Sequence, residues 1–183
     1  MGTPHPAERV KLFIAIMHAP DFAPALVMDR LKERFGEVEA GYGPVGFSWS
    51  DYYAPEMGSG LQKFYAVFCR TIERGELPGI KLWTNDMEAV YARDGKRSVN
   101  IDPGYLARDK LVLATTKDFF HRLYLGRGIY GEVTLHLRDG IYRFFSWTYP
   151  DYQEKKLHEL LFKARASLVG ELRKQGTSGK SAR

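Results

Sequence analysis

The N-terminal part of the chain alternates short apolar runs with an amphipathic segment. Residues 10–17 (VKLFIAIM) are apolar without a helical stripe, which predicts a buried central strand. Residues 22–35 place Phe and Leu side chains along one side of a helix, and Gly36 follows as a stop signal. The last part of the glycine-punctuated segment that comes next, VGFSWS (45–50), alternates well enough to predict a second strand.

The middle of the chain continues this pattern. Residues 61–72 (LQKFYAVFCRTI) are the longest strand candidate, and because both registers are largely apolar we expect both faces to be covered. Apolar residues recur at helical spacing over 80–90, and residues 98–101 predict a short strand broken by the sequence Asp-Pro-Gly. The order strand, helix, strand, strand, helix, strand is that of a ferredoxin-like unit, a fold that hosts many unrelated functions.

Beyond residue 105 the pattern predicts antiparallel hairpins. A strand over 111–116 (LVLATT) precedes two runs, 119–125 and 130–138, which flank the connection Gly126-Arg127-Gly128 and are expected to pair. The dipeptide Asp139-Gly140 is a strong signal for a two-residue turn, and residues 141–147 form the next strand candidate.

A last helix follows Pro150, with Asp151 as its expected N-cap. We therefore predict an α+β fold, in which a ferredoxin-like core is extended by antiparallel hairpins and a C-terminal helix. Residues 1–175 are expected to form a single domain, and the polar segment 176–183 a disordered tail. The apolar stripe of the helix consists of Leu157, Leu160, Leu161, Ala164, Leu168 and Leu172.

The net charge of +5 is concentrated at the C-terminus. From Gln153 onward the chain carries eight Lys or Arg and three Glu, whereas residues 1–152 hold nineteen bases and nineteen acids. A basic helix face is usually a solvated face, so a nucleic-acid footprint is the alternative that this distribution does not favour.

The single cysteine, Cys69, excludes a disulfide within the monomer and fits a reducing compartment. Because Cys69 lies inside an apolar run, we expect it to be a small core residue. The N-terminal sequence has no basic-then-apolar leader and no apolar run approaches the length of a membrane span, so we expect a cytoplasmic protein that contacts no membrane.

Familiar catalytic motifs are missing from the sequence. The GKS at 179–181 lacks the first glycine of a P-loop, and the five histidines do not form a close ligand pair. His121 and His136 fall on paired strands, where they could meet beside Glu132, but we assign no metal, and the sequence leaves the cofactor unknown. The aromatic strand KFYAVF (63–68) resembles an RNA-stacking strand without its glycines, which favours a buried core.

An anion site is the hypothesis that the hairpin supports best. Lys117, Arg122 and Arg127 are close in sequence, and the glycines beside Arg127 let backbone amides approach a ligand. The alternative stays open: Lys117 and Arg122 pair with Asp118, Glu132 or Asp102 and have a structural role.

Four runs resemble one protein family. DYYAPEMGSGL (51–61), IKLWTNDMEAVYARDGKRSVNIDPGYL (80–106), KLVLATTKDFFHRLYLGRGIYGEVTL (110–135) and WTYPDY (147–152) are similar to domain of unknown function 4416, a prokaryotic family. The resemblance implies no known reaction, cofactor or fold. Phe120 departs from the family pattern, in which a small residue is favoured at that position.

The resemblance also implies a cleft in which loop 51–57, Asp102, the 117–132 hairpin and WTYPDY meet, because so many charged groups exceed what a core needs. In it we expect His121 as general acid or base, with Glu132 or Asp102 as its orienter. Besides the three cations, the expected ligand-binding residues are Asp51, Glu56, Tyr124, Tyr130, Trp147 and Tyr149.

Three functions remain open at this stage. The first is a protein that binds or acts on a phosphorylated or otherwise anionic small molecule, including a nucleotide. The second is a non-catalytic RNA-binding module that uses exposed aromatic residues and the basic C-terminus. The third is a structural protein whose charged residues form an internal salt-bridge network. The sequence does not decide whether the protein is an enzyme, and it gives no oligomeric state.

Overall fold

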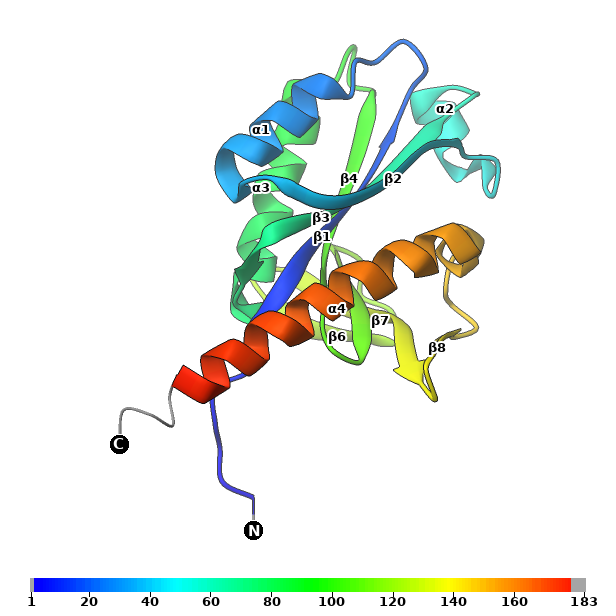
Figure 1. Ribbon diagram of the computed structural model, residues 1–183. Helices are drawn as coiled ribbons and strands as arrows, with labels where there is room; N and C mark the ends of the chain where they lie inside the picture. Colours follow the sequence, from blue (N-terminus) through cyan, green and yellow to red (C-terminus); the bar gives the residue numbers. More distant parts are fainter. Residues whose placement is uncertain (1, 179–183) are drawn as a thin grey trace.

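An antiparallel sheet of eight strands forms the centre of the computed structural model (Figure 1). The structure describes residues 2–178, and within this range the side chains of residues 51 and 175–178 are not described. The strands are β1 (Val10–His18), β2 (Val38–Gly46), β3 (Gln62–Ile72), β4 (Val99–Leu106), β5 (Lys110–Thr115), β6 (Arg122–Gly126), β7 (Ile129–Arg138) and β8 (Ile141–Phe144). The helices are α1 (Ala25–Phe35), α2 (Ala54–Met57), α3 (Leu77–Val90) and α4 (Lys155–Ser178), with 3-10 turns η1 (Asp51–Tyr53), η2 (Arg74–Glu76) and η3 (Pro150–Gln153).

The strands follow the order β2-β3-β1-β4-β5-β7-β6, and β8 also pairs with β7. One edge of β7 pairs with β5, and the other is shared by β6 along residues 129–132 and by β8 along residues 135–138. The chain is therefore a mixed α+β protein with an antiparallel sheet, as the sequence predicts.

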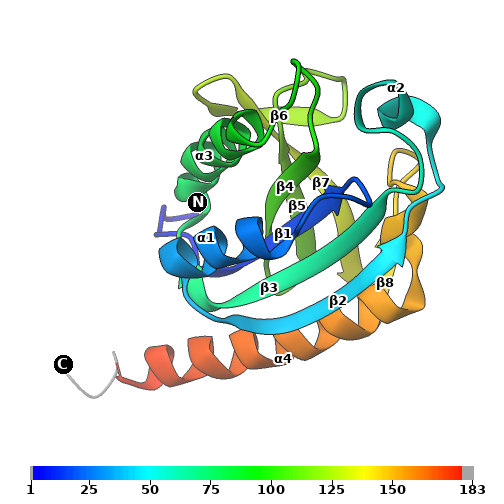
Figure 2. The same cartoon turned by 90° about the horizontal axis from the view of Figure 1, so that it is seen from above.

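Helices cover both faces of the sheet, and the alternation along β1 shows why. Leu12, Ile14 and Ile16 belong to the core cluster that includes residues of α1 and α3. Phe13 and Ala15 face the opposite way and pack in the cluster formed with α4. Figures 1 and 2 show α1 and α3 on one side of the sheet and α4 crossing the other. Every residue of β1 is buried, which confirms the predicted central strand.

The predicted strand over 45–50 is wrong, because β2 runs from Val38 to Gly46 instead. The glycines that punctuate this segment allow β2 to lie against β3. A Cβ atom on Gly43, which has a φ of 112°, would lie 2.6 Å from the carbonyl oxygen of Lys63. The strand therefore needs the residues that, in sequence, look like breaks in it.

The sequence Asp-Pro-Gly does not break the fourth strand either, since β4 continues through it to Leu106. Pro103 pairs with Ile14 of β1. The backbone N–H and C=O of Ile101 bond to side chains of α3 rather than to β1. The backbone groups of Pro103, two residues farther along, point in the same direction as those of Ile101. The N–H that proline lacks would therefore lie on the side of β4 away from β1, and its absence costs no hydrogen bond to β1.

Other local expectations also need correction. Cys69 is exposed at the end of β3 and is not a core residue. Asp151 does not cap the last helix but lies in η3, where its Oδ2 accepts hydrogen bonds from Lys63 Nζ (2.6 Å) and Tyr65 Oη (2.7 Å). Helix α4 includes residues 176–178 of the expected tail, and residues 179–183 lie outside the described residues. None of the described helices is long and apolar enough to cross a membrane.

Candidate functional site

The sheet opens between β4 and β5, and this opening positions the candidate site. The two strands pair only from Gly104–Leu113 to Leu106–Leu111, although β4 begins at Val99 and β5 continues to Thr115. Where they separate, a Cβ on residue 104 would lie 2.3 Å from the carbonyl oxygen of Val112, so the close approach requires glycine. A pocket of about 390 Å³ lies at this opening. It is lined by Tyr52, Tyr53, Lys81, Asn85, Glu88, Arg97, Asn100, Asp102, Leu113, Ala114, Thr115, Thr116, Lys117, Arg122, Glu132 and Tyr149.

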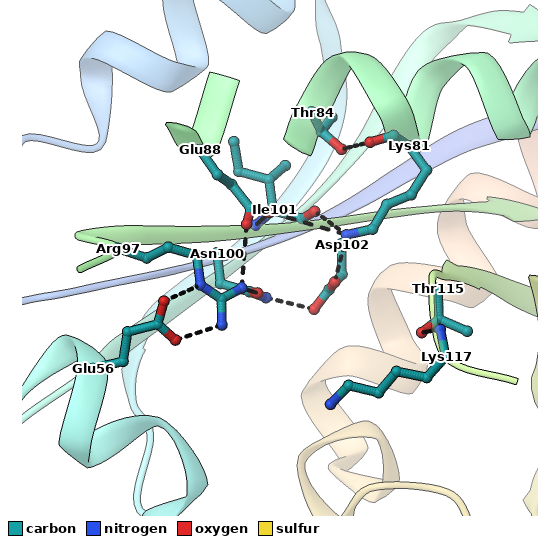
Figure 3. Close-up of polar contacts among 10 residues, drawn as sticks. All are labelled: Glu56, Lys81, Thr84, Glu88, Arg97, Asn100, Ile101, Asp102, Thr115 and Lys117. Carbon is teal, nitrogen blue, oxygen red and sulfur yellow. Dashed lines mark hydrogen bonds and ion pairs between the residues drawn. The ribbon is translucent and has the colours of Figure 1, made fainter. Parts of the chain in front are cut away.

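Two side chains of α3 occupy the hydrogen-bonding edge that β4 presents here (Figure 3). Lys81 Nζ donates to the carbonyl oxygen of Ile101 at 2.9 Å, and Glu88 Oε1 accepts from the Ile101 amide at 2.7 Å. Lys81 and Glu88 are both buried. A buried backbone group must be paired, so these side chains take the place that a neighbouring strand would have.

The carboxylate of Asp102 is held from two sides on the same strand edge. Its Oδ1 accepts from Lys81 Nζ at 3.1 Å, and its Oδ2 accepts from Asn100 Nδ2 at 2.7 Å. Burial alone would raise the pKa of Asp102, but the positive charges of Lys81 and Lys63 and these hydrogen bonds lower it below its usual value. Asp102 therefore contributes an ionised carboxylate to the lining of the pocket.

Arg97 continues the network toward α2. Its guanidinium donates to both carboxylate oxygens of Glu56 at 2.7 Å, to Glu88 Oε2 at 3.2 Å and to Asn100 Oδ1 at 2.8 Å. The hydrogen bond from Arg97 lowers the pKa of Glu56. Burial raises the pKa of Glu88, although Lys81 and Arg97 oppose that shift. The cations on this wall thus all have carboxylate partners.

The opposite wall centres on Glu132, which pairs with Arg122 across the β6–β7 ladder. Glu132 Oε2 accepts from Arg122 Nε at 2.9 Å and lies 3.0 Å from His121 Nε2. Arg122 also donates to the carbonyl oxygen of Lys117 at 3.1 Å, and its side chain is 6% exposed. Glu132 Oε1 has no hydrogen-bond partner within the described part of the chain, so it remains the free acceptor of this wall.

Lys117 differs from the other lining cations because no carboxylate of the described residues lies within ion-pair distance. Its ammonium donates to the hydroxyl of Tyr52 at 2.8 Å and lies 4.5 Å from the centre of the Tyr52 ring. This hydrogen bond lowers the pKa of Tyr52. In Figure 3, Lys117 lies on the other side of Asp102 from Arg97. Its charge is therefore available to a ligand.

Several neutral polar groups complete the lining. The side chains of Asn85, Thr116, Tyr53 and Tyr149 make no hydrogen bond to another described residue. Burial, with Asp102 nearby, raises the pKa of Tyr53, so this hydroxyl stays protonated and can donate. These groups offer directional contacts beside the charge of Lys117.

The structure brings together five of the predicted site residues: Asp102, Lys117, Arg122, Glu132 and Tyr149 line one pocket. Glu56 is connected to it through Arg97. His121 contacts Glu132 from outside the lining and stacks on Trp147, with ring centres 4.9 Å apart. The roles of these residues stay predictions.

The other predicted residues lie elsewhere. Arg127 borders a different pocket near the first turn of α3, so it does not join Lys117 and Arg122. Tyr124 and Tyr130 face each other on the hairpin, with ring centres 5.3 Å apart, outside the pocket lining. The side chain of Asp51 lies outside the described part of the structure.

The two histidines considered for a metal do not meet. The ring centres of His136 and Phe145 are 5.1 Å apart, and those of Phe145 and Trp147 are 4.6 Å apart. Trp147 in turn stacks on His121, so two aromatic rings lie between the two histidines. Among the residues that the structure describes, no group of three or more His, Cys, Asp or Glu is arranged to hold a metal ion.

Sequence reasoning missed the contribution of α3. Lys81, Asn85 and Glu88 are four and three residues apart, which places them on one face of the helix, next to apolar positions that face the sheet. Charged residues at such spacing on the buried side of a helix are the signal that would have pointed to them. Arg97 carries no comparable signal, because its partner Glu56 lies 41 residues away in the sequence. Asn100 is two residues from its partner Asp102 on the same strand, so their shared strand face is a local signal that could have pointed to it.

The fold and the pocket define an α+β protein with a charged, ligand-sized opening between two strands of its sheet. The family model for a domain of unknown function (DUF4416) matches residues 8–168, and the chain belongs to this family. Neither the curated proteins nor the solved structures contain a match to the chain.

Proposed function

We propose that the pocket between β4 and β5 binds a small anionic molecule, whose negative group pairs with Lys117. The observation that carries this proposal is the pairing of charges around the pocket. Lys81, Arg97 and Arg122 each have a carboxylate partner, whereas Lys117 is bonded to the hydroxyl of Tyr52. A phosphate or carboxylate would supply the counter-charge that Lys117 lacks among the described residues.

The neutral groups support recognition of a polar body attached to that anion. Asn85 and Thr116 can donate or accept hydrogen bonds, and Tyr53 and Tyr149 add aromatic surface with hydroxyl ends. A volume of about 390 Å³ lies in the range of small-ligand pockets, so a sugar phosphate or a nucleotide fits the class.

Glu132 is the group that we assign to proton transfer on a bound ligand. Its Oε2 is held by Arg122 and His121, while its Oε1 is free of hydrogen bonds to the described residues. His121 then acts as a positioning residue behind Glu132, which reverses the roles expected from the sequence. Asp102 serves the site as a fixed negative charge, because both of its oxygens are occupied.

The binding proposal is tested with the variant Lys117→Gln. We expect a thermal-shift screen of nucleotides, sugar phosphates and small carboxylates to find a ligand that raises the melting temperature of the wild-type protein. The shift should disappear in Lys117→Gln and persist in Lys163→Gln, which removes an exposed lysine of α4. A ligand-induced shift that survives in Lys117→Gln would contradict the proposal.

A structural role for the charged network is the second candidate function, and one observation favours it. Arg122 is buried against Glu132, so Arg122→Ala would strand a carboxylate and should cost about 3–5 kcal/mol of unfolding free energy. If Arg122→Ala unfolds the protein and no ligand is found, the network serves the fold alone. A steep loss of RNA affinity with rising salt would instead favour the RNA-binding alternative.

Two broader assignments belong to the same proposal. The unit from β1 to β4 is ferredoxin-like, an assignment supported by the strand order β2-β3-β1-β4 with antiparallel neighbours and by α1 and α3 on one face. A cytoplasmic location is supported by the exposed thiol of Cys69, which a reducing compartment would keep free.

A further inference from the structure

A second pocket, of about 500 Å³, lies between the end of α1, the end of β3, the first turn of α3 and the turn between β6 and β7. Three arginines line it, one from each of three separate segments: Arg34 from α1, Arg70 from β3 and Arg127 from the β6–β7 turn. The pocket shares no lining residue with the one between β4 and β5.

The three guanidinium groups have no acidic partner among the described residues. Arg34 lies over the ring of Trp83, 4.5 Å from its centre, and makes no ion pair there. Arg70 and Arg127 make no hydrogen bond or ion pair with any residue that the structure describes. The one acidic side chain in the lining is Glu76, whose Oε1 already accepts a hydrogen bond from the Glu73 amide.

The backbone of the β6–β7 turn brings Arg127 next to α3. It adopts a φ of 57° between two glycines, in the left-handed region that non-glycine residues rarely occupy. Its guanidinium then lies over α3, so close that a Cβ on Gly79 would be 3.3 Å from one of its nitrogens. The turn thus directs a positive charge to the first turn of a helix, where the helix dipole also favours an anion.

We infer that this second pocket binds a phosphorylated small molecule, with its phosphoryl oxygens on the three arginines. Guanidinium groups from three segments around one pocket match the several oxygens of a phosphate better than the two oxygens of a carboxylate. The lining also contains Leu125, which is 39% exposed, beside Phe35, Ile72 and Ile80, which are buried in the core. The exposed Leu125 offers an apolar contact to a ring attached to the phosphate, as in a nucleoside phosphate.

The inference is independent of the proposed function, because the two sites use different residues. Titration calorimetry with ADP and with inorganic pyrophosphate tests it on the full chain. We expect saturable binding of ADP and weaker binding of pyrophosphate, because pyrophosphate lacks a ring that could contact the exposed Leu125. The variants Arg70→Gln and Arg127→Gln should each weaken ADP binding by at least about tenfold, as expected for the loss of a charged hydrogen bond.

Three further measurements make the test specific. Arg143→Gln removes an exposed arginine of β8 outside both pockets and should leave ADP binding unchanged. Lys117→Gln distinguishes the two pockets: ADP binding that depends on Arg127 should persist in this variant, whereas ADP bound in the first pocket should be lost. Because Arg70 and Arg127 have no partners to strand in the described part of the chain, their variants should keep the melting temperature of the wild-type protein.

Several results would overturn the inference. They are the absence of saturable ADP binding, an equal loss of affinity in Arg143→Gln, and a loss caused by Lys117→Gln rather than by Arg127→Gln. Tighter binding of a single-stranded oligonucleotide than of ADP, weakened by the same arginine variants, would assign the surface to nucleic acid instead.

Discussion

Replacing Lys81 by methionine tests how the open edge of β4 is stabilised. Lys81→Met keeps a long side chain in α3 but removes the ammonium that bonds the carbonyl oxygen of Ile101 and the carboxylate of Asp102. The side chain of Lys81 is 8% exposed, so water cannot easily replace it at the carbonyl. The variant therefore leaves one backbone acceptor and one charge without their principal partner.

The expected magnitude follows from these contacts. A buried acceptor left unpaired costs about 1–3 kcal/mol, and breaking a buried ion pair from one side costs about 3–5 kcal/mol. The side chain of Asp102 is 29% exposed to the pocket, so water can partly solvate the stranded carboxylate and the ionic loss is reduced. We expect a decrease of about 3 kcal/mol in the free energy of unfolding.

Urea denaturation of the wild-type protein, Lys81→Met, Glu88→Gln and the double variant measures this effect. Because Lys81 and Glu88 bond the same peptide edge at Ile101, the two losses should be non-additive. Lys155→Met, which removes a lysine that is 91% exposed, is the matched control and should change stability little. A loss below about 1 kcal/mol for Lys81→Met would show that the helix does not complete this strand edge.

Two further predictions concern the same region. Gly104→Ala should destabilise the protein by about 1–3 kcal/mol or more, because the new methyl group would clash with the carbonyl oxygen of Val112. The control in the same denaturation experiment is Gly46→Ala in β2, whose new methyl group would have no atom within 4 Å. Glu56→Gln should lower stability at neutral pH but not in acid. The lowered pKa of Glu56 means that its ion pair stabilises the fold above the usual value of 4.5 and ceases to do so as pH falls through the lowered value, so melting curves of the two proteins should converge there. Curves that stay equally separated at all pH values would contradict this assignment.

Local periodicity was enough to predict the central strand, the helices α1, α3 and α4, and the β6–β7 hairpin, because those signals lie within one segment; the short helix α2 falls in a segment that was expected to be a loop. It failed for β2 and β4, where Gly43 and Pro103 look like breaks in sequence. Both residues are tolerated for reasons that only the neighbouring elements supply. The backbone of β2 comes so close to β3 at Gly43 that a side chain would not fit, and the N–H that Pro103 lacks would point away from β1. Such tertiary effects override local propensity.

The candidate site was predicted only in part, because some of its contacts follow from local pairing and others depend on distant segments. Arg122 and Glu132 pair directly across the hairpin, so their proximity follows from the strand pattern. Arg127 was expected to join them, but it is five residues farther along, which corresponds to roughly 16 Å of strand. Its place is the turn at the tip of the hairpin, where it reaches α3 near Gly79. The helical spacing of Lys81 and Glu88 could have pointed to a buried polar pair, but not to its bonds with β4, since these depend on the separation of β4 from β5.

The most direct test of the binding proposal is the affinity of one anionic ligand for the wild-type protein and for Lys117→Gln, measured by calorimetry. Lys117 is exposed and bonded to Tyr52, so the variant should fold with an unchanged melting temperature. We predict that affinity falls at least about tenfold in Lys117→Gln and is unchanged in Lys163→Gln, as expected for the loss of a charged hydrogen bond. Equal affinities of the wild-type protein and Lys117→Gln would contradict the proposal.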